Sequence, residues 1–365
     1  MIREAAASAE DSNARNDSGA DSKTNARDDS GAFESAPPGE VSVVVPAFNE
    51  EQSIVRLLEA LDAQTLRPAE IVVADGGSTD RTRALVREFG ARSTVPVVLV
   101  ESERGLPGRN RNLAIERASR EWVACVDAGT VPRRDWLERL VEAARRGPRA
   151  RVVFGCYEAL GESFFTRCAA CVYVPAPGEA VRSTASCLLH RSAWERAGRF
   201  REDLRSAEDR LFFLALDAAR VPVTHAPEAF VAWELRPTLA ATFEKFTAYA
   251  RNNMRAGLAG EWQRGVARVY LVLLASLVAS LVYRPLLVLP PLILLARGAR
   301  RVWRWRAREP VSRRVASLFN LPRLLLVTWI NFVIDVATFY GTFQWFVHDH
   351  VGVPEPDEKE VRGRQ

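Results

Sequence analysis

Residues 41–51 read VSVVVPAFNEE, and residues 70–80 read EIVVADGGSTD. In each stretch a short run of mostly apolar, β-branched residues leads directly into a polar, turn-forming segment. Two further apolar runs follow at 96–101 (PVVLVE) and 121–127 (EWVACVD), and amphipathic segments separate the four. Strands that alternate with helices in this way are typical of βαβ units and of a parallel sheet covered on both faces.

The pattern becomes mixed after residue 150, where strands and helices no longer alternate regularly. We expect two strands and three helices in this half, at 151–158 and 186–190 and at 164–172, 203–219 and 238–257, with a short strand pair near Val221 and Phe230. These elements would extend the sheet and close over its edge. The sequence therefore predicts an α/β fold over residues 41–260, a Rossmann-like mixed sheet with helices on both faces.

Polar residues follow three of the predicted strands directly. Pro46 and Glu50 come after the first, Asp75 after the second and Asp127 after the fourth. Ligands of open α/β sheets bind at the carboxyl ends of the strands, so these residues mark a candidate site. The first turn lacks the glycines of a dinucleotide-binding or P-loop motif, which argues against a dehydrogenase and the simplest ATPase.

Five motifs in order resemble the inverting family 2 glycosyltransferases of the GT-A fold. They are the two stretches quoted first, GRNRNLA at 108–114, the strand-end Asp127, and AED at 207–209. The resemblance covers roughly residues 41–257. It implies transfer of a sugar from a nucleotide diphosphate donor, with UDP favoured as the carrier.

The resemblance also assigns roles on the donor side. Pro46 and Glu50 would cradle the nucleotide, Asp75 would hydrogen-bond the base, and Arg109 would lie near the nucleotide. Asp127 would bind the ribose and a metal ion. A helix at 243–255 occupies the place of the family's closing motif, and Arg251 in it is a weak candidate for the diphosphate.

The family's second metal-binding aspartate is replaced here by Gly129. Mg²⁺ or Mn²⁺ is normally held by one or two carboxylates together with phosphate oxygens, and glycine supplies neither. We expect Mg²⁺ or Mn²⁺ through Asp127 and water, or neutralisation of the diphosphate by Arg109 and Arg251. Gly129 also motivates an alternative, a catalytically silent nucleotide-binding or scaffold protein of the same fold.

An inverting transfer needs a carboxylate that takes the proton of the acceptor hydroxyl. The resemblance implies Asp209 as this base, with Glu208 orienting the acceptor. The competing interpretation is that Ser206, Glu208 and Asp209 only cap a helix and complement its dipole.

The C-terminal part of the chain predicts membrane-associated helices over residues 266–347. The segment 269–296 is apolar except for Arg284 but is broken by prolines, and the apolar stretch 324–347 is interrupted by Asp335. Between them, 297–314 contains eight arginines and one glutamate, and we expect it to be a basic cytoplasmic loop. The first segment would form a bent or re-entrant hairpin and the second would cross once; as an alternative, both would lie in the membrane interface.

The two ends of the chain predict disordered tails, at 1–40 and 348–365, because they contain too few large apolar side chains to fold. The expected location is the bacterial cytoplasmic (inner) membrane with the catalytic domain in the cytoplasm. The expected partners are a nucleotide-sugar donor, a lipid-linked or glycan acceptor and membrane lipids. We expect no nucleic acid, since only three of the fifty basic residues are lysines and the excess of arginine is a bias of composition.

Overall fold

The parallel half of the sheet is built from the predicted strands. In the computed structural model they are β1 (Val41–Ala47), β2 (Glu70–Asp75), β3 (Val97–Glu101) and β4 (Trp122–Cys125). β1 lies between β2 and β4, and β3 pairs with the far side of β2, all in parallel. The structure describes residues 39–351 except 104, 177, 178, 180, 261 and 308.

The second half of the domain adds strands of both directions to this sheet. They are β5 (Thr130–Pro132), β6 (Val152–Leu160), β7 (Cys187–His190) and β8 (Val223–Glu234). Within the described residues the sheet has eight strands in the order β3-β2-β1-β4-β7-β6-β8-β5, and β7 runs antiparallel to both of its neighbours. The predicted mixed α/β sheet is confirmed, although β5 was missed and the short pair near Val221 and Phe230 is one long strand.

Alternation along each strand supplies a separate core for each face of the sheet. In β1, Val43 and Val45 point to one face and Val44 to the other. The first face is covered by α1 (Ile54–Asp62), α2 (Thr82–Gly90) and α4 (Trp136–Arg146), and the second by α3 (Pro107–Arg117), α6 (Arg191–Arg196) and α7 (Glu208–Ala218). Because both faces are buried, the strands read as nearly continuous apolar runs.

A third core joins the sheet domain to the C-terminal helices. It is formed by α5 (Phe164–Tyr173), α8 (Leu239–Arg255), α10 (Leu289–Trp305) and α12 (Leu321–Trp345). α12 lies along α8, and Gly341 permits this approach, because a Cβ there would lie 2.2 Å from the carbonyl oxygen of Thr247. Helices on both sides of the expected domain boundary near residue 260 therefore pack into the same core.

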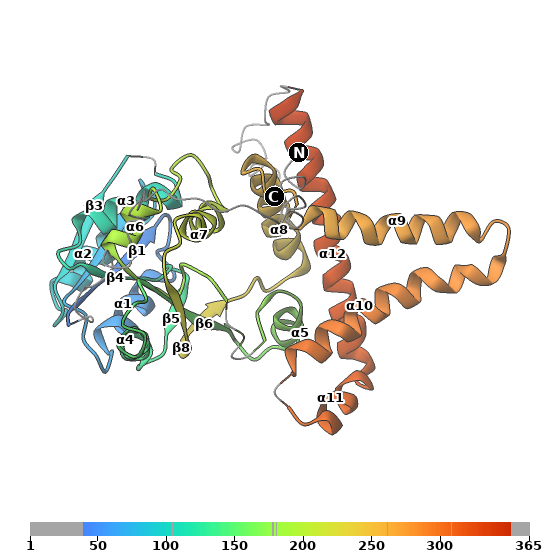
Figure 1. The fold of residues 1–365 in the computed structure, drawn as a ribbon, viewed down its shortest axis with the longest axis horizontal. Coiled ribbons are helices and arrows are strands. Elements are labelled where there is room, and N and C mark those ends of the chain that lie inside the picture. Colours follow the sequence, from blue (N-terminus) through green and yellow to red (C-terminus); the bar gives the residue numbers. More distant parts are fainter. Residues whose placement is uncertain are drawn as a thin grey trace, which may run out of the picture. The chain divides into compact units, whose positions relative to one another are not determined.

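The prolines of the first apolar segment separate two helices that fold back on each other. α9 (Gln263–Ala279) and α10 run side by side and are joined through the 3₁₀ turn η2 (Arg284–Val288) (Figure 1). We call residues 263–305 the apolar hairpin. Its large apolar side chains are exposed around the turn: Leu271, Leu274, Leu277, Val278, Leu281, Val282, Tyr283, Leu287, Val288 and Leu292.

The segment 297–314 is mostly helical, which corrects the expectation of a loop. Its first residues continue α10, and its last residues begin α11 (Val311–Leu318). Helix is favoured because α10 has an apolar side, on which Val302 is buried against α5 and α12. Arg297 on this helix donates to the buried Asp335 carboxylate.

One helix of the described residues, Leu321–His350, is long and apolar enough to cross a membrane, and 44% of its most apolar window is buried in the protein. It consists of α12 and the short π-helix η3 (Phe346–His350), so the helix continues past the predicted start of the C-terminal tail. The predicted tail at 1–40 lies outside the described residues except at its last two positions, and the other tail lies outside them from 352 onward.

Candidate active site

The turns after β1 and β2 are joined by hydrogen bonds into one wall of a cleft. The backbone N–H of Asn49 donates to Ser78 Oγ at 2.9 Å, and Thr79 N–H donates to Asn49 Oδ1 at 2.8 Å. The N–H of Glu50 donates to Thr82 Oγ1 at 2.7 Å. Asn49 adopts a left-handed φ of 56°, a conformation that asparagine tolerates better than most residues.

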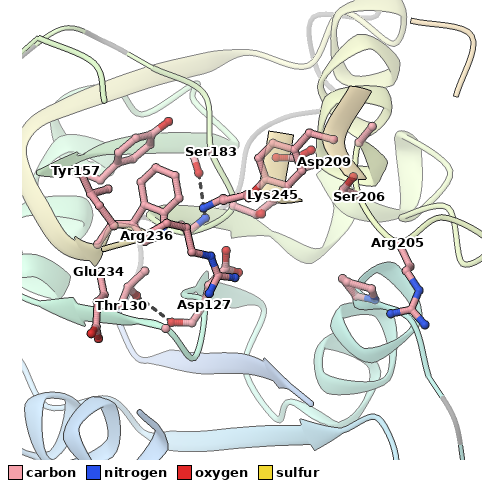
Figure 2. A pocket seen from close by; sticks show the side chains of 18 of the residues that line it. Asp127, Thr130, Tyr157, Ser183, Arg205, Ser206, Asp209, Glu234, Arg236 and Lys245 are labelled. Carbon is pink, nitrogen blue, oxygen red and sulfur yellow. Dashed lines mark hydrogen bonds between the residues drawn. The ribbon is translucent and has the colours of Figure 1, made fainter. Parts of the chain in front are cut away.

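A cleft of about 1030 Å³ opens at this edge of the sheet, between the two turns, the start of α7, the end of β8 and α8 (Figure 2). Four of the residues selected from the sequence line it: Glu50, Asp127, Glu208 and Asp209. Four others lie outside its lining: Pro46, Asp75, Arg109 and Arg251. The structure thus brings together residues that are up to 159 positions apart.

Asp75 is fully buried behind the cleft, where it holds the second turn. Its Oδ2 accepts the N–H of Gly77 at 3.1 Å and of Ser78 at 2.9 Å. Its Oδ1 has no hydrogen-bond partner among the described residues. A buried acceptor without a donor is costly, so this oxygen is suited to a ligand N–H. Glu50 is partly buried at the neighbouring turn, and burial raises its pKa against the lowering effect of its bond with Ser53.

Arg111, which was not predicted from the sequence, lines the cleft between two of the predicted carboxylates. It is buried, its Nη2 donates to Asp127 Oδ1 at 2.8 Å, and its Nη1 donates to Glu208. Arg109 lies two residues before Arg111 on α3. Side chains two positions apart on an α-helix project about 200° apart, so Arg109 points away from the buried side and is exposed. The donor-side role expected for Arg109 is therefore better suited to Arg111. The buried Ile115, four residues later on the same face, was the available signal.

Glu208 and Asp209 begin α7 with different surroundings. Glu208 is 4% exposed and pairs with Arg111, and its expected role in orienting the acceptor stays a prediction. Asp209 faces the cleft (Figure 2), and burial, together with the adjacent Glu208 charge, raises its pKa to about 6 against the lowering effect of Arg111. Ala207 at the N-cap of α7 has a φ of 73° and no side chain that could cap the helix, but Asp209 Oδ1 accepts the N–H of Arg210 in the first turn at 2.7 Å. Asp209 thus contributes to the start of the helix as well as to the cleft, and its role as the base stays a prediction.

Two further cations, Arg236 after β8 and Lys245 on α8, line the cleft (Figure 2). Lys245 Nζ is 3.8 Å from the centre of the Trp233 ring. Burial lowers the pKa of Lys245 to about 7, Arg236 lowers it further, and Asp127 opposes this shift. Arg251 lies elsewhere, with its Nε 4.0 Å from a carboxylate oxygen of Asp349, so its expected contact with the diphosphate finds no support.

The carboxylates present do not form a site that would hold Mg²⁺ or Mn²⁺ through the protein. One oxygen of Asp127 is already occupied by Arg111, and Gly129 contributes no side chain. A Cβ at Gly129 would meet no atom within 4 Å, so the place of a second carboxylate is open space. Among the described residues no group of three or more His, Cys, Asp or Glu side chains is arranged to bind a metal. Of the two carboxylates expected to bind the metal ion, the chain supplies only Asp127.

The cleft also has an aromatic wall on the side of the C-terminal helices. Its residues are Tyr157, Tyr173, Trp233, Phe246, Tyr249 and Trp262. Phe246 packs edge-on against Tyr173, Tyr249 and Trp262, which fixes these rings relative to one another. Such a wall offers flat apolar surfaces to a sugar ring or a lipid chain.

Comparisons with known proteins identify a family model and several relatives that each match part of this chain. Residues 42–194 match the family model described as Glycosyl transferase family 2. Glycosyltransferase AglE of Haloferax volcanii is 35% identical over 101 residues, which are 27% of this chain and 33% of that protein. The poly(ribitol-phosphate) beta-N-acetylglucosaminyltransferase TarS of Staphylococcus aureus is 37% identical over 89 residues, 24% of this chain and 16% of that protein. The chain thus spans a third or less of the length of these relatives.

The fold has a counterpart among solved structures. The mannosyltransferase PcManGT of Pyrobaculum calidifontis, solved with GDP-Man and Mn²⁺, superposes with a TM-score of 0.52 at 20% identity, over 84% of this chain and 87% of that one. This likeness agrees with a GT-A sheet carrying helices on both faces. Read with the strand-end turns and the cleft that they border, the family match agrees with the resemblance of residues 42–194 to the family 2 glycosyltransferases.

Proposed function

We propose that this protein is a membrane-attached inverting glycosyltransferase. It moves a sugar from a nucleoside diphosphate donor, with UDP favoured, to a lipid-linked or polysaccharide acceptor at the cytoplasmic face of the bacterial inner membrane. The observation that carries the proposal is the position of Asp209, which faces the same cleft as Asp127 and the strand-end turns.

The donor side of the cleft supports a bound nucleotide. The turns after β1 and β2 border it, and Asp75 Oδ1 behind them lacks a hydrogen-bond donor. A ring N–H of uracil or guanine would supply that donor. On this assignment the diphosphate extends past Asp127 toward Arg236 and Lys245.

Asp209 serves as the base in the transfer. The acceptor hydroxyl oxygen attacks the anomeric carbon from the face opposite the nucleotide and forms the new C–O bond. The bond between that carbon and the β-phosphate oxygen breaks, and its electron pair leaves with the nucleoside diphosphate. The hydroxyl proton passes to the Asp209 carboxylate, whose raised pKa suits it to accept a proton near neutral pH. With one carboxylate at the expected metal position, we assign no part of this step to Mg²⁺ or Mn²⁺.

The apolar hairpin supports attachment to a membrane. Val282 at its turn is 93% exposed and Leu281 is 84% exposed, which is unfavourable for side chains of this kind in water. α9 has 17 residues and is therefore about 25 Å long, too short to cross a bilayer comfortably but long enough to enter it. An acceptor carried on a lipid would thus lie close to the aromatic wall.

Flotation with phospholipid vesicles tests the attachment. We expect Leu281→Asp with Val282→Asp to weaken vesicle binding at least tenfold, since burial of each side chain in lipid contributes about 1.5–3 kcal/mol. The thermal midpoint in detergent should not change, because both positions are exposed. Equal flotation of the variant and the wild type would contradict the role of the hairpin.

The transfer itself is tested with purified protein, radiolabelled UDP-glucose, UDP-GlcNAc and GDP-mannose, and a bacterial lipid extract. Label that moves to the organic phase in the wild type and not in Asp209→Asn would support the proposal. If UDP and GDP neither bind nor raise the thermal midpoint, the silent-scaffold alternative takes its place.

A further inference from the structure

A departing nucleoside diphosphate carries negative charge that the protein has to stabilise in a glycosyl transfer. Family 2 enzymes are expected to use a divalent cation for this, and the solved mannosyltransferase contains Mn²⁺. In this chain the second carboxylate of that site is absent, because position 129 is glycine. The question is which groups of the cleft provide the missing positive charge.

Arg236 and Lys245 are suited to this task by position. Arg236 follows β8, Lys245 lies on α8, and both line the cleft that contains Asp127 (Figure 2). The charge of Asp127 acts on Lys245, which indicates that the two groups lie near each other.

The same two side chains lack acidic partners. Neither forms an ion pair with any acidic residue that the structure describes, although many other cations of the sheet domain do. The neighbours of Lys245 Nζ are the rings of Trp233, at 3.8 Å, and Tyr249, at 5.4 Å. Two neighbouring cations that form no close ion pair repel each other, and an anionic ligand would remove that cost.

We propose that Arg236 and Lys245 stabilise the leaving diphosphate in place of a protein-bound divalent cation, so that donor binding does not require a metal. This inference rests on the proposed function and specifies how its donor site is built. Both side chains donate hydrogen bonds to the diphosphate oxygens as the bond to the anomeric carbon breaks, and the electron pair of that bond remains on the β-phosphate oxygen they contact. On this proposal no carboxylate is needed at position 129 to bind a metal ion, and the space beside Gly129 stays open.

Calorimetric titration of the full chain in detergent with UDP and with GDP tests the proposal, once with EDTA and once with MnCl₂. We expect one of the two nucleotides to bind with EDTA present and MnCl₂ to change its Kd less than threefold. Lys245→Met and Arg236→Met should each weaken binding about 10- to 100-fold, as the loss of a charge-assisted hydrogen bond does. Arg67→Met is the matched control, because Arg67 is exposed and precedes β2 at the opposite end of the strand.

The outcomes separate this inference from the proposed function. Binding that needs MnCl₂, or a Kd that Lys245→Met and Arg236→Met leave unchanged, overturns the inference while the glycosyltransferase proposal stands. Failure of both nucleotides to bind under either condition overturns both.

A gain of metal dependence offers a second test. Gly129→Asp restores the missing carboxylate, and its side chain meets no obstruction within 4 Å of the Cβ. We expect MnCl₂ to tighten nucleotide binding at least tenfold in this variant and not in the wild type. The same response to MnCl₂ in both proteins would contradict the proposal.

Discussion

The two sides of the cleft carry their charges in different ways. On the α3–α7 wall (Arg111, Asp127 and Glu208) every charge has a partner, since the arginine bridges the two carboxylates. On the β8–α8 wall (Arg236 and Lys245) neither cation forms a close ion pair with an acidic residue that the structure describes. Paired buried charges fix the positions of the groups that bear them, whereas unpaired charges in a cleft are available to a ligand. The difference suggests that the first wall sets geometry and the second binds substrate.

The largest expected effect concerns the base, which stands next to the paired wall. Asp209→Asn keeps the size of the side chain and removes its ability to take a proton. We expect the rate of sugar transfer to fall about 10²- to 10⁴-fold, the usual contribution of a general base. The thermal midpoint verifies folding. Transfer at the wild-type rate in a folded variant would show that another group accepts the proton.

The paired wall should respond to mutation mainly through stability. Arg111→Met leaves the buried Glu208 carboxylate without its counter-charge, which costs about 3–5 kcal/mol of unfolding free energy, while the half-exposed Asp127 adds little. Arg109→Met, two residues away and exposed, should change stability by less than about 0.5 kcal/mol. Denaturant titration compares them. Equal stability of the two variants would mean that the pairing does not support the fold.

The pH dependence of transfer depends on the same wall. Asp209 acts as a base only when deprotonated, so the rate should rise with pH through about 6 and fall about tenfold per unit below it. Glu208 contributes to this raised pKa through its negative charge. Glu208→Gln should therefore move the midpoint of the profile to lower pH. A shift to higher pH would indicate that the loss of its contact with Arg111 dominates.

The unpaired wall should have the smallest effect on stability. Lys245→Met loses a contact with Trp233 and removes a buried charge, and we expect a net change within about 1 kcal/mol at pH 7. The pKa of lysine is 10.5 in an unfolded chain, and burial lowers the pKa of Lys245 to about 7 in this site. Between pH 7 and 10 the unfolded chain therefore binds more protons than the folded protein. The stability of the wild type relative to the variant should therefore increase as pH rises from 7 to 10. Chemical denaturation at several pH values measures this difference, and a constant difference would place Lys245 in a more hydrated site.

The sequence predicted the parallel strands well, because their valine-rich runs alternate with amphipathic helices and end in recognisable turns. It was less successful where packing decides the structure. The segment 297–314 reads as a basic loop, yet an apolar stripe that includes Val302 makes much of it a helix in the third core. β5 has only three residues and was missed, since so short a strand leaves no periodic pattern.

Among the site residues, the sequence by itself determined those that follow directly from local motifs, namely the turns after β1 and β2, Asp127, and the Glu208–Asp209 pair. Only the tertiary structure decided that Arg111 faces inward and Arg109 faces solvent, because the side of α3 that is buried depends on what packs against it. Only the tertiary structure brought Arg236 and Lys245 to Asp127, from more than a hundred residues later in the chain. Short-range patterns fix strands and turns, whereas the meeting of distant charges depends on how the sheet and its covering helices pack.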